Sequence, residues 1–296
     1  MKTLKKLFST TCCVLLLLAY AEQSAARPNQ VKAEIDSNFV PLITKLTEAG
    51  FDKAWLESQF KRACVTLDTQ GLVLRLIVRE SKINYGQFLE PSPINDTKAF
   101  LKKYSASFSR AQATYQVPAE LIAAILLLET RLGTFLGQFQ TLRTLASHAV
   151  GATPAVAAVV WQSLPPQEKK IWTKEAVGNA LGKYSSWFFG ELKAFMEYLK
   201  KTEKDPCQVF GSYTGAIGLC QFQPSNIKPY GQDGNGDGIV DLFRVEDAIM
   251  SVGFYLKQHG WRDGLSEAQK INVLKTYNNS TPYAQTLLEV ARRAKP

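Results

Sequence analysis

The segment PAELIAAILLLETRLG, residues 118–133, constrains the fold of this chain more than any other part of the sequence. Pro118 is suited to open a helix, because a proline in the first turn gives up no hydrogen bond that the helix needs. The run LIAAILLL that follows is apolar on every face of such a helix. The pattern therefore predicts a buried helix that ends at Glu129.

The carboxyl group of Glu129 directly follows this apolar run. The carboxyl end of a helix carries a partial negative charge, and the leucines before Glu129 predict dry surroundings. Both conditions disfavour the ionised form and would raise the pKa of this carboxyl, as a general acid requires. A structural ion pair with Arg131 or a lysine explains the same residue equally well. Other motifs have to decide between the two interpretations.

Length and composition indicate a folded globular protein. The chain has 296 residues, of which 46% are hydrophobic and 21% are charged. These values argue against disorder and against a bundle of membrane helices, and the length fits one large domain or two closely packed ones. The formal net charge of +9 suits an anionic polymer such as cell-wall material, although scattered lysines often only solvate a surface. No nucleic-acid-binding motif is recognisable, so we expect no nucleic-acid partner.

Residues 1–21 have the features of a secretory signal peptide. Three lysines precede an apolar run that is too short to cross a bilayer, and small residues follow it. Cleavage after Ala21 or Ala26 leaves a basic mature chain. Cys12 and Cys13 lie inside the apolar run, whereas a lipid-bearing cysteine should follow it. We expect an exported monomer, periplasmic or cell-wall associated, that is not a lipoprotein and has no transmembrane segment in the mature chain.

The rest of the sequence predicts a mainly α fold. Residues 30–110 show helical spacing of apolar residues and predict an N-terminal helical region. Residues 111–296 form the expected catalytic core, with an irregular insertion or a helical excursion at about residues 149–183. Neither a fixed-period repeat nor a strong series of alternating strands is present, so β-structure should be limited to a small β or loop element.

Three cysteines remain after processing, in a compartment that export would make oxidising. Cys64, Cys207 and Cys220 allow at most one disulfide within the chain. The pair Cys207–Cys220 flanks a glycine-rich segment and is one candidate. The sequence does not supply the Cα separation that a disulfide requires, so the pairing stays open.

The glycine-rich segment GSYTGAIGLCQFQPS, residues 211–225, has a composition that suits a sugar chain. Its glycines allow the backbone to approach a ligand closely. Ser212, Gln221 and Phe222 supply a hydroxyl, an amide and a ring for the hydroxyl groups and apolar faces of sugars. Structural turns are the commoner role of such segments, so this one is weak support by itself.

The acidic loop that begins at Asp233 reproduces the first half of a calcium-binding EF-hand. Asp233, Asn235 and Asp237 occupy positions one, three and five, a glycine follows at six, and the carbonyl of Ile239 falls at seven. Position twelve is Arg244, which cannot bind calcium. From these residues alone, a structural Ca²⁺ site and a plain turn rich in Asp and Asn both remain open.

Five motifs, taken in order, carry a resemblance to a known family: LETRLG at Glu129, GSYTGAIGLCQFQPS, DGNGDGIVDLF, EDAIMSVGFYLKQHGW and TYNNSTPYA. Their order resembles that of the MltB-type lytic murein transglycosylases, glycoside hydrolase family 103, over residues 115–284. The resemblance implies a lysozyme-like helical core. It also implies cleavage of the β-1,4 bond between N-acetylmuramic acid and N-acetylglucosamine in the glycan strands of peptidoglycan.

The resemblance further implies a role for each matched residue. Glu129 would be the single catalytic acid and base: it protonates the glycosidic oxygen, then deprotonates the C6 hydroxyl of muramic acid, and a 1,6-anhydro product forms. Asp247, at position fifteen, would close the calcium loop. The cleft positions of the family match Ser212, Gln221, Phe222, Tyr255, Tyr277, Asn278 and, through weaker matches, Tyr85 and Lys183. Core packing of Tyr255 and a turn at Asn278 are the plainer alternatives.

We find no second acid in the matched cleft motifs, although acids elsewhere in the chain could still fold into the cleft. Glycosidases that use water need two carboxyl groups, whereas attack by the C6 hydroxyl needs only one, which favours a transglycosylase. Two alternatives stay open. A hydrolytic lysozyme would bring another carboxyl group into the cleft, and a calcium-stabilised peptidoglycan-binding module would lack turnover.

Overall fold

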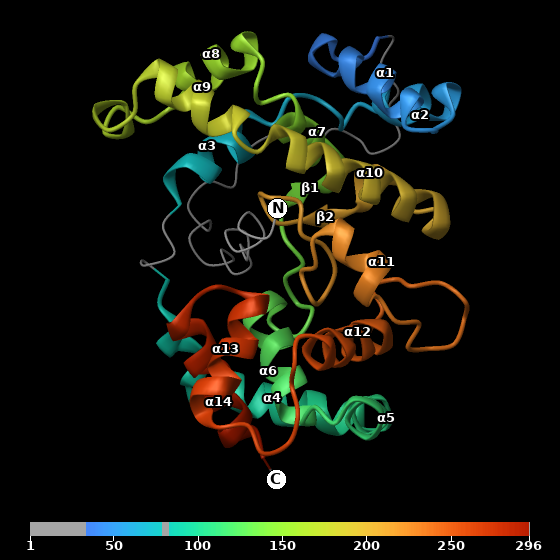
Figure 1. Cartoon of the computed structure of the whole chain (residues 1–296), viewed down its shortest axis with the longest axis vertical. Helices are drawn as coiled ribbons and strands as arrows, with labels where there is room; N and C mark the ends of the chain where they lie inside the picture. The colour runs from blue at the N-terminus through green and yellow to red at the C-terminus, as the bar shows by residue number, and fades with distance from the viewer. Residues whose placement is uncertain (1–33, 79–82, 296) are drawn as a thin grey trace.

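The computed structural model describes residues 34–78 and 83–295, so the expected signal peptide lies outside the described residues. The described chain is mainly α-helical, which confirms the fold class, and its helices gather into two lobes (Figure 1). We call them the upper and lower lobes, after their places in that view. Within the described ranges, no single helix is long and apolar enough to cross a membrane.

The upper lobe combines the first helices of the chain with helices from its middle. Its elements are α1 (Val40–Glu48), α2 (Lys53–Phe60), α3 (Thr69–Ile77), α7 (Thr141–Ala149), α8 (Pro154–Ser163), α9 (Lys174–Gly182), α10 (Ser185–Thr202) and the strands β1 (Phe139–Gln140) and β2 (Phe210–Gly211).

The lower lobe combines the helices that lie between these two groups with those that end the chain. Its elements are α4 (Pro91–Lys103), α5 (Ser105–Tyr115), α6 (Ala119–Thr130), α12 (Val245–Gln258), α13 (Glu267–Tyr277) and α14 (Thr281–Ala294). The short helix α11 (Ile227–Tyr230) follows the 3₁₀ turn η7 (Pro224–Asn226) and lies between the lobes.

Helix α6 is the buried centre of the lower lobe. Every residue from Leu121 to Thr130 is buried, as the apolar run predicts, and α4, α5, α12 and α14 pack around it. Pro118 caps the helix rather than lying inside it. The backbone of Arg131 turns into the left-handed region, with φ of 49°, and ends the helix one residue beyond Glu129.

A two-stranded antiparallel sheet forms the small β element. Phe139 pairs with Gly211, and Gln140 pairs with Phe210. A Cβ atom at Gly211 would lie only 2.2 Å from the carbonyl oxygen of Ala216, so the turn after β2 requires glycine at this position. The sheet therefore fixes where the glycine-rich segment enters the space between the lobes.

The structure distributes the described part of residues 30–110 between both lobes. Helices α1–α3 pack in the upper lobe, where α3 contacts α7, α8 and α9, whereas α4 and α5 pack against α6 and α12 in the lower lobe. The stretch at residues 149–183 is mostly helical, because α8 and α9 occupy it and pack on each other.

The candidate disulfide Cys207–Cys220 is wrong. Cys207 instead pairs with Cys64, at a Cα–Cα distance of 5.8 Å, and Cys220 is a buried free thiol. The bond joins the turn that follows α2 to the 3₁₀ turn η6 (Pro206–Gln208) across 143 residues of sequence. Only tertiary packing brings these two segments together, which is why the flanking positions in the sequence were misleading.

Candidate active site

Glu129 lies in the last turn of α6, and its side chain is fully buried. The hydroxyl of Tyr283 donates a hydrogen bond of 2.6 Å to Glu129 Oε1. Tyr283 lies in the first turn of α14, where the side chain of Ser280 caps the helix and accepts from Tyr283 N. A phenol can donate to a carboxylate and accept from a carboxylic acid, so this contact suits both protonation states of Glu129.

Cys220 and Tyr277 lie close enough to Glu129 to sense its charge. Burial is the main cause that raises the pKa of the Cys220 thiol, and the charge of Glu129 adds to the rise. The pKa of the Tyr277 hydroxyl is likewise raised by burial and, less strongly, by the charges of Cys220 and Glu129. Tyr277 donates a 2.5 Å hydrogen bond to the carbonyl of Cys220. Glu129 is therefore close to Cys220 and Tyr277, which directly precede the predicted site residues Gln221 and Asn278.

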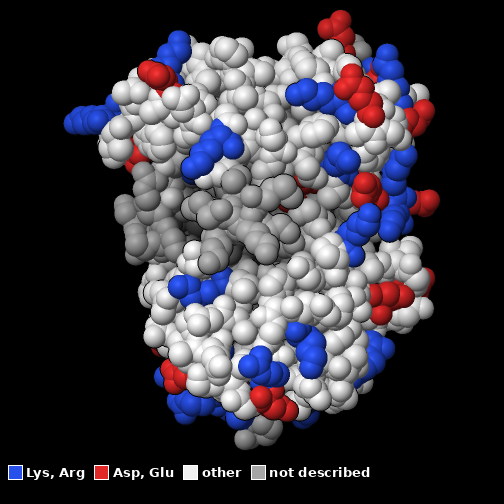
Figure 2. Space-filling view, in the orientation of Figure 1, with Lys and Arg blue, Asp and Glu red and all other residues white. Residues whose placement is uncertain are grey.

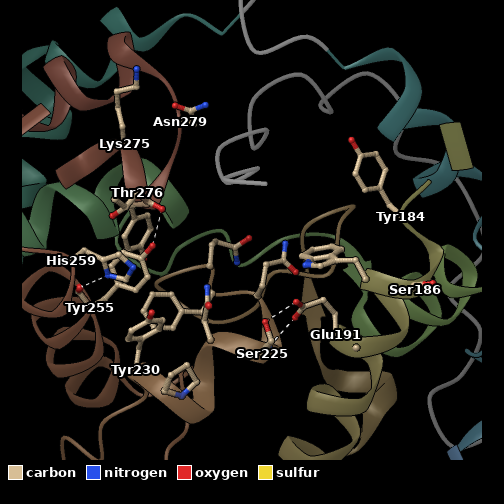
Figure 3. A pocket seen from close by; sticks show the side chains of 18 of the residues that line it. Tyr184, Ser186, Glu191, Ser225, Tyr230, Tyr255, His259, Lys275, Thr276 and Asn279 are labelled. Atoms are coloured by element: carbon tan, nitrogen blue, oxygen red, sulfur yellow. Dashed lines mark hydrogen bonds between the residues drawn. The ribbon is translucent and has the colours of Figure 1, made fainter. Parts of the chain in front are cut away.

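A cleft of about 1140 Å³ separates the two lobes beside this group. Figure 3 shows Tyr184, Ser186 and Glu191 on the side of the upper lobe, with Tyr255 and Lys275 on the facing side. The residues between these walls come from the end of the glycine-rich segment, from η7 and from α11. They are Gln221, Phe222, Gln223, Ser225, Asn226, Pro229 and Tyr230.

Aromatic rings from three parts of the chain meet in the lower wall of the cleft. The ring centroid of Phe222 lies 5.5 Å from that of Tyr255 and 5.9 Å from that of Tyr277. Tyr255 also packs on Tyr230 and stacks on His259, at 4.9 and 3.9 Å. Such rings offer flat apolar surfaces to sugar rings, and their polar atoms fix orientation. Tyr255 thus combines core packing with a place in the cleft.

Gln221 is the first of the residues between the two walls, which form the floor of the cleft, and its contacts hold it in place. Its backbone lies in the left-handed region, with φ of 47°. Its side-chain amide donates to the carbonyls of Leu136 and Gly218, at 3.2 and 3.0 Å. Thr130 Oγ1 donates to the carbonyl of Leu219 at 2.9 Å, which joins the end of α6 to the same segment. The residue after Glu129 and the residues before Gln221 therefore form one rigid group.

Of the residues that the family resemblance indicates, five line the cleft and three more do not. Gln221, Phe222, Tyr255, Tyr277 and Lys183 line it. Ser212 lies outside it and accepts from the backbone N–H groups of Thr214 and Ala216, so its hydroxyl stabilises a turn.

Asn278 and Tyr85 do not line the cleft. Asn278 is buried and caps α13, between the lining residues Tyr277 and Asn279. Tyr85 belongs to the 3₁₀ turn η4 (Tyr85–Leu89), and its ring meets the ring of Tyr283 edge-on at 6.1 Å. Tyr85 therefore packs on the residue that donates a hydrogen bond to Glu129.

Sequence reasoning missed three residues that the structure brings to this site. Tyr283 belongs to the matched motif TYNNSTPYA, which could have placed it near the site. Its hydrogen bond to Glu129 could not be predicted from the sequence. Lys275, two residues before Tyr277, lines the cleft. Glu191 lines it too, although the motifs identified as cleft motifs contain no second acid.

Glu191 is therefore a second carboxyl group in the cleft wall, and its surroundings are specific. Only 2% of its surface is exposed. Ser225 donates its backbone N–H to Oε2 at 2.8 Å and its hydroxyl to Oε1 at 2.7 Å. Burial raises the pKa of Glu191 above its usual value, although the two hydrogen bonds from Ser225 act against the rise.

The acidic loop has the donor atoms that calcium prefers. Asp233 accepts from the backbone of Gly238 at 2.7 Å, and Asn235 donates to Asp237 at 2.9 Å. These hydrogen bonds close the loop and bring the expected ligands together. Asp247 lies against this closed loop and accepts from Gly234 N at 2.8 Å. Oxygen donors of this kind suit a hard cation. The described residues nevertheless contain no ready-made cluster of three His, Cys, Asp or Glu side chains.

The charges around the loop support the same fit. Burial raises the pKa of Asp247, and the charge of Asp233 contributes to that rise. A cation would relieve this repulsion between carboxylates. Arg110 of α5 donates to the carbonyl of Gly234 and so fastens the loop to the lower lobe. Arg244 points elsewhere and contacts Asp241 at 4.0 Å.

Charged side chains are spread over both lobes. Figure 2 shows lysines and arginines scattered across the visible face and mixed with Asp and Glu. This distribution is typical of a solvated surface rather than of a continuous basic patch.

The chain matches the model of the transglycosylase SLT domain family over residues 35–273. It is 30% identical over 178 residues to the membrane-bound lytic murein transglycosylase B of Escherichia coli K12, and the match covers 60% of this chain and 41% of that relative. The chain thus spans less than half the length of this curated relative.

Two solved structures share the fold. The lytic transglycosylase Slt35 of Escherichia coli in complex with calcium has a TM-score of 0.66 and 22% identity, covering 91% of this chain and 98% of its own. SltB3 of Pseudomonas aeruginosa in complex with NAG-NAM-pentapeptide has a TM-score of 0.67 and 18% identity, covering 86% of this chain and 78% of its own. Because the family model spans most of the chain, the protein belongs to the transglycosylase SLT domain family.

Proposed function

We propose that this protein is a peptidoglycan lytic transglycosylase that cleaves the MurNAc-GlcNAc β-1,4 bond and leaves a 1,6-anhydro-MurNAc end. The observation that carries the proposal is the buried Glu129, held by the Tyr283 hydroxyl beside a large aromatic cleft. The printed names of the relatives support the substrate: one is a murein transglycosylase, and another holds a NAG-NAM-pentapeptide.

The reaction needs one residue that first gives and then takes a proton. Protonated Glu129 donates its proton to the glycosidic oxygen, which leaves as the 4-hydroxyl of GlcNAc while the bond to C1 of MurNAc breaks. The resulting carboxylate removes the proton from the C6 hydroxyl, whose oxygen bonds to C1. Glu129 ends the cycle protonated, and no water is consumed. Buried surroundings favour the protonated start, and the Tyr283 hydroxyl can accompany both states.

The lining of the cleft suits a glycan strand. Phe222, Tyr255 and Tyr277 offer ring faces, and the amide oxygen of Gln221 and the amide of Asn279 offer hydrogen bonds to sugar hydroxyls. Lys183 and Lys275 line opposite walls and place positive charge where the anionic groups of peptidoglycan would lie. We assign substrate contacts to these residues, and supporting roles to Tyr85, Ser212 and Asn278.

We further propose a structural calcium ion in the acidic loop. Asp233, Asn235, Asp237 and Asp247 would supply side-chain oxygens, and Ile239 would supply its carbonyl. The ion would stiffen the loop that leads from the glycine-rich segment into α12. The calcium complex of Slt35 supports this assignment by its name. Export to the periplasm or cell wall, action as a monomer, and release from a signal peptide at residues 1–21 belong to the same proposal.

Digestion of purified murein sacculi tests the function. The mature protein is expected to release 1,6-anhydro-muropeptides, each one water lighter than a lysozyme product, and Glu129→Gln should release none. Muropeptides with reducing muramic acid ends would instead identify a lysozyme. Binding of sacculi by a folded wild-type protein without any soluble product would identify a binding module.

A further inference from the structure

The second carboxyl group of the cleft, Glu191, is not used by the proposed reaction. It is nearly fully buried at the middle of α10, in the wall that faces the aromatic rings. A carboxyl group that activates water or attacks a sugar must present an oxygen to the substrate. Each oxygen of Glu191 instead accepts a hydrogen bond from Ser225. The carboxyl group of Glu191 is therefore placed to accept hydrogen bonds from the protein rather than to react with the substrate.

The partner of Glu191 stands at a point where a helical segment begins. Ser225 is the second residue of η7, which leads directly into α11. The first N–H groups of a helical segment have no partner within it, and Pro224 has no N–H to offer. The cap position of η7, Gln223, makes no side-chain capping bond. Glu191 thus caps η7 from another helix, because it accepts from the first N–H group of the turn.

The segment that Glu191 holds carries much of the cleft floor. Gln221 and Phe222 precede Ser225 by a few residues, and Tyr230 follows it at the end of α11. On one side, Phe222 and Tyr230 pack on Tyr255 of the lower lobe. On the other side, the two hydrogen bonds from Ser225 fasten the segment to α10 of the upper lobe.

We infer that Glu191 is a positioning residue: through Ser225 it fixes the segment of residues 221–230, and so sets Gln221 and Phe222 against the substrate, without exchanging protons in the reaction. This inference rests on the proposed function for its activity readout. It explains how a cleft with two carboxyl groups still follows a route that needs one.

Three substitutions test the inference in the full mature chain. Glu191→Gln keeps an oxygen for the Ser225 N–H, and its amide can donate to the Ser225 hydroxyl, so kcat/KM should stay within about threefold of wild type. Glu191→Leu removes the acceptor of both the Ser225 N–H and the Ser225 hydroxyl, which releases this segment from α10, and should lower kcat/KM at least about tenfold. Glu197→Gln, on the exposed face of α10, is the matched control and should change nothing.

Coupling distinguishes a positioning role from a catalytic one. Ser225→Ala removes one of the two donors, so Glu191→Leu should cost less activity in that background than in wild type. Hydrogen exchange of peptides from residues 221–230 gives a readout that needs no activity. Exchange should be faster in Glu191→Leu and unchanged in Glu191→Gln.

Two outcomes would overturn the inference. One is a Glu191→Gln protein that is stable, shows wild-type exchange at residues 221–230, and is as inactive as Glu129→Gln. The other is a change in the share of anhydro ends in the products of any Glu191 variant. If Glu191→Leu does not fold, the Glu191→Gln and Ser225→Ala variants carry the test. A wild-type protein that makes no anhydro product would refute the proposed function instead. The exchange data would still test whether Glu191 fixes residues 221–230 through its hydrogen bonds with Ser225.

Discussion

The two glutamates near the cleft are both buried, yet their surroundings differ in kind. Glu129 lies at the end of a helix in the lower lobe and meets a side-chain hydroxyl, that of Tyr283. Glu191 lies in the middle of a helix in the upper lobe and binds both donors of one residue, Ser225. A phenol can reverse its hydrogen bond when its partner gains a proton, whereas a backbone N–H can only donate. Burial alone does not distinguish an acid from a structural carboxyl group, but the donors do.

The largest expected effect separates the two residues directly. Glu129→Gln removes the only acid and base that the proposed route uses, and kcat should fall by about 10³-fold or more. Glu191→Gln should keep most of the activity. Initial rates on sacculi, measured for both variants with matched circular dichroism spectra, check this contrast. Equal losses in the two variants would mean that the cleft uses two carboxyl groups.

The disulfide tests the stability of the side on which Glu191 lies. Cys64–Cys207 joins the turn after α2 to η6 in the upper lobe, just before β2. Replacing both cysteines by serine should lower the free energy of unfolding by about 3 kcal/mol, because the unfolded chain gains freedom. Denaturant unfolding measures this loss, and Cys220→Ala serves as the control because that thiol forms no disulfide. An unchanged unfolding midpoint in the double variant would show that the bond does not form.

Calcium tests the side on which Glu129 lies, because the acidic loop is fastened to α5 and α12 of the lower lobe. At a calcium concentration about 100 times its Kd, binding should stabilise the protein by about 2.7 kcal/mol, so chelation should lower Tm. Adding calcium back should restore Tm in wild type and not in Asp233→Ala. The same melting curve with and without calcium would remove the assignment.

The hydroxyl of Tyr283 is the next test of the comparison. Tyr283→Phe keeps the ring but removes the donor to Glu129, and kcat should fall roughly tenfold, as expected for one hydrogen bond to an ionisable group. Ser225→Ala should lower kcat less, because Glu191 keeps the backbone donor. Steady-state kinetics of the two variants decide the order, and a larger loss in Ser225→Ala would reverse the roles given to the two glutamates.

The smallest effect is a pH dependence of stability that belongs to Glu191. Burial raises its pKa in the folded protein. Between the unfolded and folded pKa the folded state binds more protons, so this contribution is complete at low pH and is lost as pH rises. The Glu191→Gln side chain cannot ionise. The Tm of this variant should therefore rise relative to the Tm of wild type as pH increases from acid to neutral. A Tm difference that does not change with pH would contradict this sign.

Much of the fold was readable from the sequence because its signals are local. The apolar run before Glu129 predicted a buried helix, and the lack of alternating patterns predicted little β-structure. The disulfide was misjudged because its two cysteines approach only through packing across 143 residues. No short-range pattern records such a contact.

The candidate site was readable in part for the same reason. Motif order pointed to Gln221, Phe222 and Tyr277, which the structure brings to one cleft. Glu191 was overlooked because its significance depends on Ser225, a residue of a distant segment. Ser212 drew attention as a hydroxyl near glycines, yet its oxygen is used within its own turn.

The isotope content of the products tests most directly whether Glu129 works alone. Sacculi are digested in ¹⁸O-labelled water, and the released muropeptides are analysed by mass spectrometry. Attack by the C6 hydroxyl predicts anhydro ends without ¹⁸O, with the same isotope pattern in the Glu191→Gln products. Reducing ends that carry ¹⁸O would show that a water molecule attacks, and that a second group must activate it.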